Sequence, residues 1–301
     1  MRRAPALGPG DRVRLVAPSG PFPRDRFERG VEVLRRYGVE PVWEPDLFDT
    51  HRYLAGSDAR RLGELQRALD DPSCAAILAV RGGYGAMRLL PRLRLDGMLR
   101  RPKLFCGFSD LTALHAMLNR AGLVTLHGPM VCRLGEEPDE SLDRLRRLAE
   151  GLAPGPLLWE PVRTVTPGVA EGPLVGGNLS VFSRLVGTPY LPPLDGAVLF
   201  LEDVGERPYR LDRMLTHLRL AGVAERVAGV LVGQLTACEA PNADYDAETV
   251  VAECLAEWQV PCAMGFPAGH GEVNLALPLG LGCRLDASLG RLDFEGPATQ
   301  S

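Results

Sequence analysis

The chain has 301 residues, of which 46% are hydrophobic, and a formal net charge of −4 at pH 7. This length allows one large or two medium domains, each with a sizeable core, and we expect two. The slightly acidic balance gives no electrostatic reason to expect nucleic acid or an anionic membrane surface as a partner, so we expect a small ligand.

In the first half of the chain, apolar runs alternate with amphipathic ones, which is typical of parallel βαβ units. The apolar runs predict five strands, at 13–17, 39–43, 75–80, 103–108 and 123–126. Helical spacing of apolar residues predicts helices at 23–37, 86–93 and 111–120. Leu62, Leu65 and Leu69 predict a further helix that ends at Asp70. We therefore expect an α/β domain with an open parallel sheet.

Four polar or glycine-rich loops follow the ends of these strands, at 18–21, 81–85, 107–110 and 127–129. Ligands of open α/β sheets bind at the carboxyl ends of the strands. We therefore expect the four loops to converge on one rim of the sheet and to form a ligand site there.

Ser109 lies where the strand 103–108 turns sharply into the helix 111–120. A serine at such a junction has its hydroxyl clear of the sheet and beside the N–H groups of the helix start, which suits a nucleophile. The usual Gly-x-Ser-x-Gly elbow is absent, however, and Ser109 or Asp110 can instead be an ordinary N-cap. The motif alone favours the cap, whereas its place among the four loops favours a site.

The glycines of the loop 81–85 do not form a nucleotide-binding motif. Gly82, Gly83 and Gly85 do not match Gly-x-Gly-x-x-Gly, and the chain has no phosphate loop, so we expect neither a nicotinamide cofactor nor a nucleoside triphosphate. Glycines do let backbone amides approach a ligand atom closely, which an oxyanion hole requires.

Residues 154–171 are rich in proline and glycine and lack helical periodicity, so we expect a linker between domains at 1–153 and 172–301. The second domain is expected to be mixed α/β. Its predicted strands are 173–175, 197–201, 227–232 and 261–265, with a terminal hairpin at 283–286 and 291–294. Its predicted helices are 178–186, 210–220 and 248–257.

The cysteines and the apolar segments indicate the compartment. Seven cysteines, an odd number without a Cys-x-x-Cys pair, predict neither a disulfide framework nor a zinc site. The first residues contain arginines but no apolar stretch, and no later segment is long enough to span a bilayer. We therefore expect a cytoplasmic protein that binds no metal.

A serine nucleophile needs a base and a carboxylate that orients the base. Among five histidines, elimination leaves His270, which lies in a glycine-rich loop after a strand, where a side chain can face a neighbour. Glu202 and Asp203 end a nearly continuous apolar strand, and strand alternation lets only one of them face the histidine. The spacing does not say which one, and either can instead pair with a nearby arginine.

Seven segments of the chain occur in the order of the motifs of one known family. They are Val16-Ala-Pro-Ser-Gly-Pro21, Arg81-Gly-Gly-Tyr-Gly85, Gly107-Phe-Ser-Asp110, His127-Gly-Pro129, Gly176-Gly-Asn-Leu179, Leu201-Glu-Asp-Val-Gly-Glu206 and Gly269-His270. With these segments the chain resembles the LD-carboxypeptidase family, serine peptidase family S66, over nearly its whole length. The resemblance implies an N-terminal flavodoxin-like domain, a C-terminal swivelling-type domain and a homodimer.

The resemblance also implies roles for the site residues. Ser109 would be the nucleophile, His270 the general base and Glu202 its orienting carboxylate, so that the triad is assembled across two domains. The backbone N–H of Asp110 and one from Gly82 or Gly83 would form the oxyanion hole. No cofactor is implied.

The implied reaction is hydrolysis of the amide between an L-centre and a terminal D-alanine, as in cytoplasmic recycling of murein tetrapeptides. A carboxypeptidase must hold the carboxylate of its substrate, and arginine can bind it in a bidentate manner. Arg81, Arg207 and Arg213 are therefore candidates, with a structural role preferred for Arg213 on its helix. Tyr84, in the same loop as Arg81, is a further candidate substrate contact.

Two alternatives stay open. Some relatives resemble the microcin C immunity peptidase, which cleaves an acyl-sulfamoyl adenylate and uses an aromatic side chain against the base. Trp159 is an aromatic residue without an assigned place, although packing under a loop is the preferred interpretation. The second alternative is a muropeptide-binding protein without catalysis, against which the presence of all three triad residue types argues.

Overall fold

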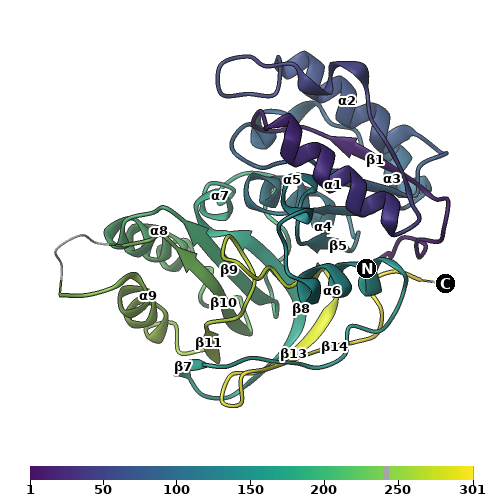
Figure 1. Cartoon of the computed structure of the whole chain (residues 1–301). Coiled ribbons are helices and arrows are strands. Elements are labelled where there is room, and N and C mark those ends of the chain that lie inside the picture. Colours follow the sequence, from purple (N-terminus) through teal and green to yellow (C-terminus); the bar gives the residue numbers. More distant parts are fainter. Residues whose placement is uncertain (240–243, 301) are drawn as a thin grey trace.

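The computed structural model describes residues 1–239 and 244–300, and Figure 1 shows two α/β bodies, one carrying the N-terminal half and the other most of the C-terminal half. The first body contains a six-stranded sheet with the order β12-β5-β4-β3-β1-β2. Its strands are β1 (Arg12–Val16), β2 (Glu40–Val42), β3 (Ala76–Ala79), β4 (Leu104–Gly107), β5 (Thr125–His127) and β12 (Leu277–Leu279). The five predicted strands are confirmed and are parallel, whereas β12 is antiparallel.

Helices cover both faces of this sheet because successive strand residues point to opposite sides. In β1, Val13 and Leu15 join one buried cluster and Val16 joins the other. One cluster contains residues of α1 (Arg24–Arg36), α5 (Val131–Leu134) and α6 (Asp139–Ala149), and the other contains residues of α2 (Asp58–Asp70), α3 (Asp96–Arg100) and α4 (Thr112–Arg120).

The prediction of a helix at 86–93 is wrong. The segment forms two short 3-10 turns, η2 (Ala86–Arg88) and η3 (Leu90–Arg92). Pro91 has no amide hydrogen to continue a helix, which explains the interruption. The helices α3, α5 and α6 were not predicted.

The second body contains an eight-stranded sheet with the order β6-β14-β13-β8-β9-β10-β11-β7. Four central strands are parallel, namely β8 (Val169–Asn178), β9 (Val198–Val204), β10 (Gly229–Thr236) and β11 (Cys262–Met264). Antiparallel strands flank them, namely β7 (Arg163–Thr166), β13 (Gly282–Asp286), β14 (Arg291–Phe294) and β6 (Leu157–Leu158). Residues 154–171, expected to be a linker, thus supply a strand to each edge of this sheet, where proline is tolerated.

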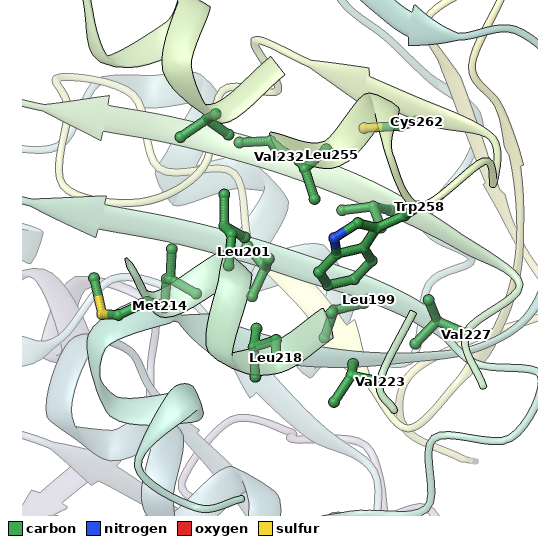
Figure 2. Close-up of a cluster of buried hydrophobic side chains, with 14 of the residues drawn as sticks. Leu199, Leu201, Met214, Leu218, Val223, Val227, Val232, Leu255, Trp258 and Cys262 are labelled. Carbon is green, nitrogen blue, oxygen red and sulfur yellow. The ribbon is translucent and has the colours of Figure 1, made fainter. Parts of the chain in front are cut away.

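The two faces of the second sheet are buried in different ways. On one face, Leu199, Leu201 and Val232 pack against helices α7 (Leu179–Ser183), α8 (Pro208–Leu220) and α9 (Ala247–Ala256), as Figure 2 shows in part. On the other face, Val198 and Phe200 pack against residues of β13 and β14 as the sheet curls into a half-barrel. Among the described helices, none is both long and apolar enough to cross a bilayer.

The two bodies are joined at the carboxyl ends of their central strands. After β11 the chain leaves the second sheet and enters the first as β12, where Leu277 pairs with His127 of β5. At the end of β8, the amide of Asn178 donates to the hydroxyl of Thr112 on α4 over 2.9 Å. The loop between β11 and β12 therefore passes from one sheet to the other beside the rim on which the site was predicted.

Candidate active site

The four predicted rim loops converge. The buried carboxylate of Asp110 accepts hydrogen bonds from the hydroxyl of Ser19 (2.6 Å) and the amide of Ala86 (2.8 Å). The amide of Gly20 donates to the carbonyl of Gly82 (3.0 Å), and that of Gly128 donates to the carbonyl of the residue that ends β4 (3.1 Å). Loops after β1, β3, β4 and β5 are thus fastened to one another, as the spacing predicted.

Ser109 begins a 3-10 turn, η4 (Ser109–Leu111), between β4 and α4. Its φ is +64°, a left-handed conformation that is uncommon for a residue with a side chain and that clusters at functional sites. Neither η4 nor α4 receives a hydrogen bond from a capping side chain. The cap interpretation therefore fails, because the Asp110 carboxylate faces the neighbouring loops and the Ser109 hydroxyl does not serve the helix.

Gly82 lies directly against the Ser109 side chain. A Cβ at Gly82 would stand 2.8 Å from Ser109 Cβ and 3.0 Å from its Oγ, so no other residue fits without a shift. In the part of the chain that the structure describes, the amides of Gly82, Gly83 and Asp110 donate to no protein acceptor. These N–H groups are available to a ligand atom near the hydroxyl.

His270 and Glu202 form a close pair. The imidazole Nδ1–H donates to Glu202 Oε2 over 2.7 Å, and the Glu202 side chain is completely buried. Gly269 has a φ of +131°, and a Cβ there would stand 2.8 Å from Glu202 Oε2, so a side chain at this position would disturb the pair. Because the carboxylate occupies Nδ1, Nε2 is the nitrogen that remains for a proton acceptor role.

Asp203 points to the opposite side of β9. Its carboxylate accepts hydrogen bonds from Asn178 Nδ2 (3.0 Å) and from the amide and hydroxyl of Ser180 (both 2.9 Å), at the start of α7. Burial raises the pKa of Asp203 to about 6, although these donors oppose the shift. The alternation of the strand therefore directs Glu202 to the histidine and Asp203 to the helix.

His270 reaches the nucleophile segment through Phe108, the residue before Ser109. The two ring centroids are 4.8 Å apart. The buried ring of His127 contacts Phe108 (5.6 Å) and also Phe200 of β9 (5.0 Å), so aromatic contacts connect both sheets here. Within residues 1–239 and 244–300, no hydrogen bond joins the Ser109 hydroxyl to His270.

Residues that the sequence analysis missed hold the His270 loop. Arg133 donates to the carbonyl oxygens of His270 and Gly271, Gln234 accepts from the amide of Gly271, and Asn274 accepts from the amide of Gly269. All are contacts to backbone atoms, which leave no motif in a sequence.

The candidate substrate residues are less closely connected. Arg81 is exposed and donates to the carbonyl of Pro21, and Tyr84 is 52% exposed. Arg207 is exposed and donates to the carbonyl of Glu239 (3.3 Å), and Arg213 stands over the ring of Tyr209. Arg81 and Tyr84 flank the glycines beside Ser109, whereas among residues 1–239 and 244–300 the contacts of Arg207 and Arg213 are to Glu239 and Tyr209, outside the site.

Trp159 is a packing residue. It is buried, its Nε1 donates to the carbonyl of Met264 (3.1 Å), and its ring meets Phe266 edge-on. Its side chain is only 6% exposed, so little of the ring is accessible to a ligand. Among the described residues, no group of three or more His, Cys, Asp or Glu side chains is placed to hold a metal ion.

Comparisons with known proteins agree over nearly the whole chain. Models of the LD-carboxypeptidase N-terminal and C-terminal domains match residues 13–128 and 171–285. A putative carboxypeptidase of Streptomyces coelicolor is 41% identical over 98% of this chain and 97% of its own length. The murein tetrapeptide carboxypeptidase of Pseudomonas aeruginosa is 35% identical over 89% and 91%. The solved structure of a microcin C7 self-immunity protein, 25% identical, superposes with a TM-score of 0.92 over all of both chains.

Proposed function

The chain belongs to the LD-carboxypeptidase family, peptidase family S66, and from that premise we propose that it releases the terminal D-alanine of murein tetrapeptides through a Ser109-His270-Glu202 triad. The observation that carries the proposal is the 2.7 Å contact between His270 Nδ1 and the buried carboxylate of Glu202. The ring of His270 also packs against Phe108, the residue that precedes Ser109. A role in cytoplasmic recycling and a homodimer stay predictions.

In the proposed mechanism, His270 Nε2 takes the Ser109 proton as the hydroxyl oxygen attacks the carbonyl carbon of the L-residue. Glu202 holds the imidazole in the required tautomer and stabilises the imidazolium. The amides of Asp110 and of Gly82 or Gly83 donate to the developing oxyanion. His270 then gives its proton to the D-alanine amine, which leaves, and water resolves the acyl-enzyme with the same base.

The carboxylate of Asp110 supports this arrangement without entering the chemistry. Burial raises its pKa, whereas its hydrogen bonds to Ser19 and Ala86 lower it. These bonds hold Asp110, and with it the N–H of the Ser109–Asp110 peptide, against the glycine loop. Arg81 and Tyr84, on either side of the glycines Gly82 and Gly83, are the proposed contacts for the substrate, and Arg207 is a further candidate for its carboxylate.

The proposal is tested by incubating the purified protein with a murein tetrapeptide ending in D-alanine, and with its analogue ending in L-alanine, and measuring free alanine. We expect release from the D-ending peptide alone. Equal release from both peptides would contradict the stereochemical assignment. Absence of release from either peptide would refute the murein activity.

We expect Glu202→Gln to lower kcat by about 10⁴, because a glutamine can no longer hold the imidazole in the correct tautomer. Alanine release measured at saturating tetrapeptide checks this effect. Asp203→Asn is the matched control, because Asp203 serves α7 and not the histidine, and it should change thermal stability more than turnover. A larger loss of turnover in Asp203→Asn than in Glu202→Gln would mean that Asp203, and not Glu202, is the carboxylate that orients His270.

A second candidate substrate is an acyl-sulfamoyl adenylate, favoured by the structural likeness to the microcin C7 self-immunity protein. The burial of Trp159 argues against this candidate, because little of the ring surface is accessible for stacking on a nucleobase. Cleavage of such an adenylate with no release from the tetrapeptide would favour it. A binding protein without catalysis is tested separately, because a serine-directed phosphonate should label Ser109 only if the serine is an activated nucleophile.

A further inference from the structure

We propose that Arg133, paired with Glu137, is a positioning residue that fixes the His270 peptide against the nucleophile-bearing body. The inference rests on the proposed function. Arg133 lies on α5, in the first body, and its Nη2 donates to the carbonyl of Gly271 over 2.7 Å. Its Nη1 donates to the carbonyl of His270 itself over 3.4 Å. One guanidinium thus holds two successive peptides of the loop that carries the general base.

The loop depends on hydrogen bonds from neighbouring elements for its shape, among them the bond from the amide of Asn274 to the hydroxyl of Ser141 on α6 (3.0 Å). It joins β11 to β12 without forming helix or strand, and Gly269 and Gly271 on either side of His270 permit many backbone conformations. The amides of Gly269 and Gly271 donate to the side-chain oxygens of Asn274 and Gln234, which are both neutral. Arg133 differs from these two acceptors in two ways. It donates to carbonyl oxygens, those of His270 and Gly271, and it comes from the body that carries Ser109.

Glu137 fixes the guanidinium and neutralises it. Its Oε1 accepts a hydrogen bond from Nε of Arg133 over 2.8 Å and lies 2.8 Å from Nη2 in an ion pair, and its side chain is completely buried. This pairing suits the proposed base, because His270 must become positively charged in the reaction and an uncompensated cation nearby would oppose that charge. The pair therefore anchors the loop and places no net charge beside the imidazole.

Arg144 offers a matched control. It lies on α6 and also crosses to the same segment of chain, where its Nε donates to the carbonyl of Ala276 over 2.7 Å. A second donor, Nη1, reaches the carbonyl of Pro154 over 2.9 Å. Arg144 is the more buried arginine, so its removal should destabilise the protein at least as much as removal of Arg133, but it makes no contact with the His270 peptide.

The test compares Arg133→Ala with Arg144→Ala for D-alanine release, phosphonate labelling of Ser109 and thermal unfolding. We expect Arg133→Ala to lower kcat and the labelling rate by about 10², the effect of an ångström-scale misplacement of a catalytic group, with KM little changed. Added guanidinium ions should restore part of this loss, because they can occupy the vacated position and donate to the same carbonyls. Arg144→Ala should lose stability without that loss of kcat.

Equal kcat losses in the two variants, or an Arg133→Ala variant as fast as the wild type, would overturn the inference. If Arg133→Ala fails to fold, Arg133→Lys takes its place, because lysine keeps the charge beside Glu137 but lacks the planar fork, and it should retain the fold and lose turnover. A wild-type protein that neither releases D-alanine nor is labelled would instead refute the proposed function, so the two failures are distinguishable.

Discussion

Replacing Ser109 with alanine is expected to lower kcat for D-alanine release by about 10⁶ and to abolish labelling by a serine-directed phosphonate. The variant loses the atom that attacks the carbonyl, whereas the amides beside it stay in place because they belong to the backbone. The fold should be retained, since alanine and serine meet the same constraint at a φ of +64° and the hydroxyl caps no helix.

The measurement is release of free alanine at saturating tetrapeptide, with circular dichroism and thermal unfolding to verify the fold. Ser183→Ala is a suitable control, because Ser183 is a buried serine of α7 whose hydroxyl donates to the carbonyl of Ser180 and accepts from the neighbouring Arg184, away from the site. It should stay active. A folded Ser109→Ala variant with turnover near that of the wild type would remove Ser109 from the role of nucleophile.

Four of the five parallel strands of the first sheet, all but β2, carry a local pattern that could be predicted, an apolar run followed by a polar or glycine-rich loop. The strand β12 carries none. Its three residues include Pro278, and it is a strand only because β5 offers a free edge after the chain returns from the second body. Similarly, β6 and β7 are short edge strands in a segment that reads as a linker.

The choice between Glu202 and Asp203 shows where sequence reasoning ends. Alternation along β9 predicted that only one carboxylate could face the histidine, and the structure agrees. The face that each residue takes depends on pairing with β8, in which Asn178 stands opposite Glu202. The family resemblance named Glu202, but the residues alone could not have done so.

Arg133 could not be predicted at all. It lies on a four-residue helix without periodicity, and its partners are carbonyl oxygens, which every residue has. His115 is a contrasting case, since its place within a predicted helix favours a core or surface role over a catalytic one. It is fully buried, and its ring bonds to Thr125 and to the carbonyl of Gly107.

Replacing His270 with alanine is expected to lower kcat by about 10⁶, as for Ser109→Ala, because a serine without its base is a poor nucleophile. Alanine release measures the loss, and His217→Ala, an exposed histidine on α8, should stay fully active. The double variant Ser109→Ala/His270→Ala is the sharper measurement. If the two residues act as one unit, it should be no slower than either single variant, because the second substitution has nothing left to remove. Losses that multiplied would mean that His270 contributes to turnover independently of Ser109, for example by orienting the substrate, and would contradict its assignment as the base.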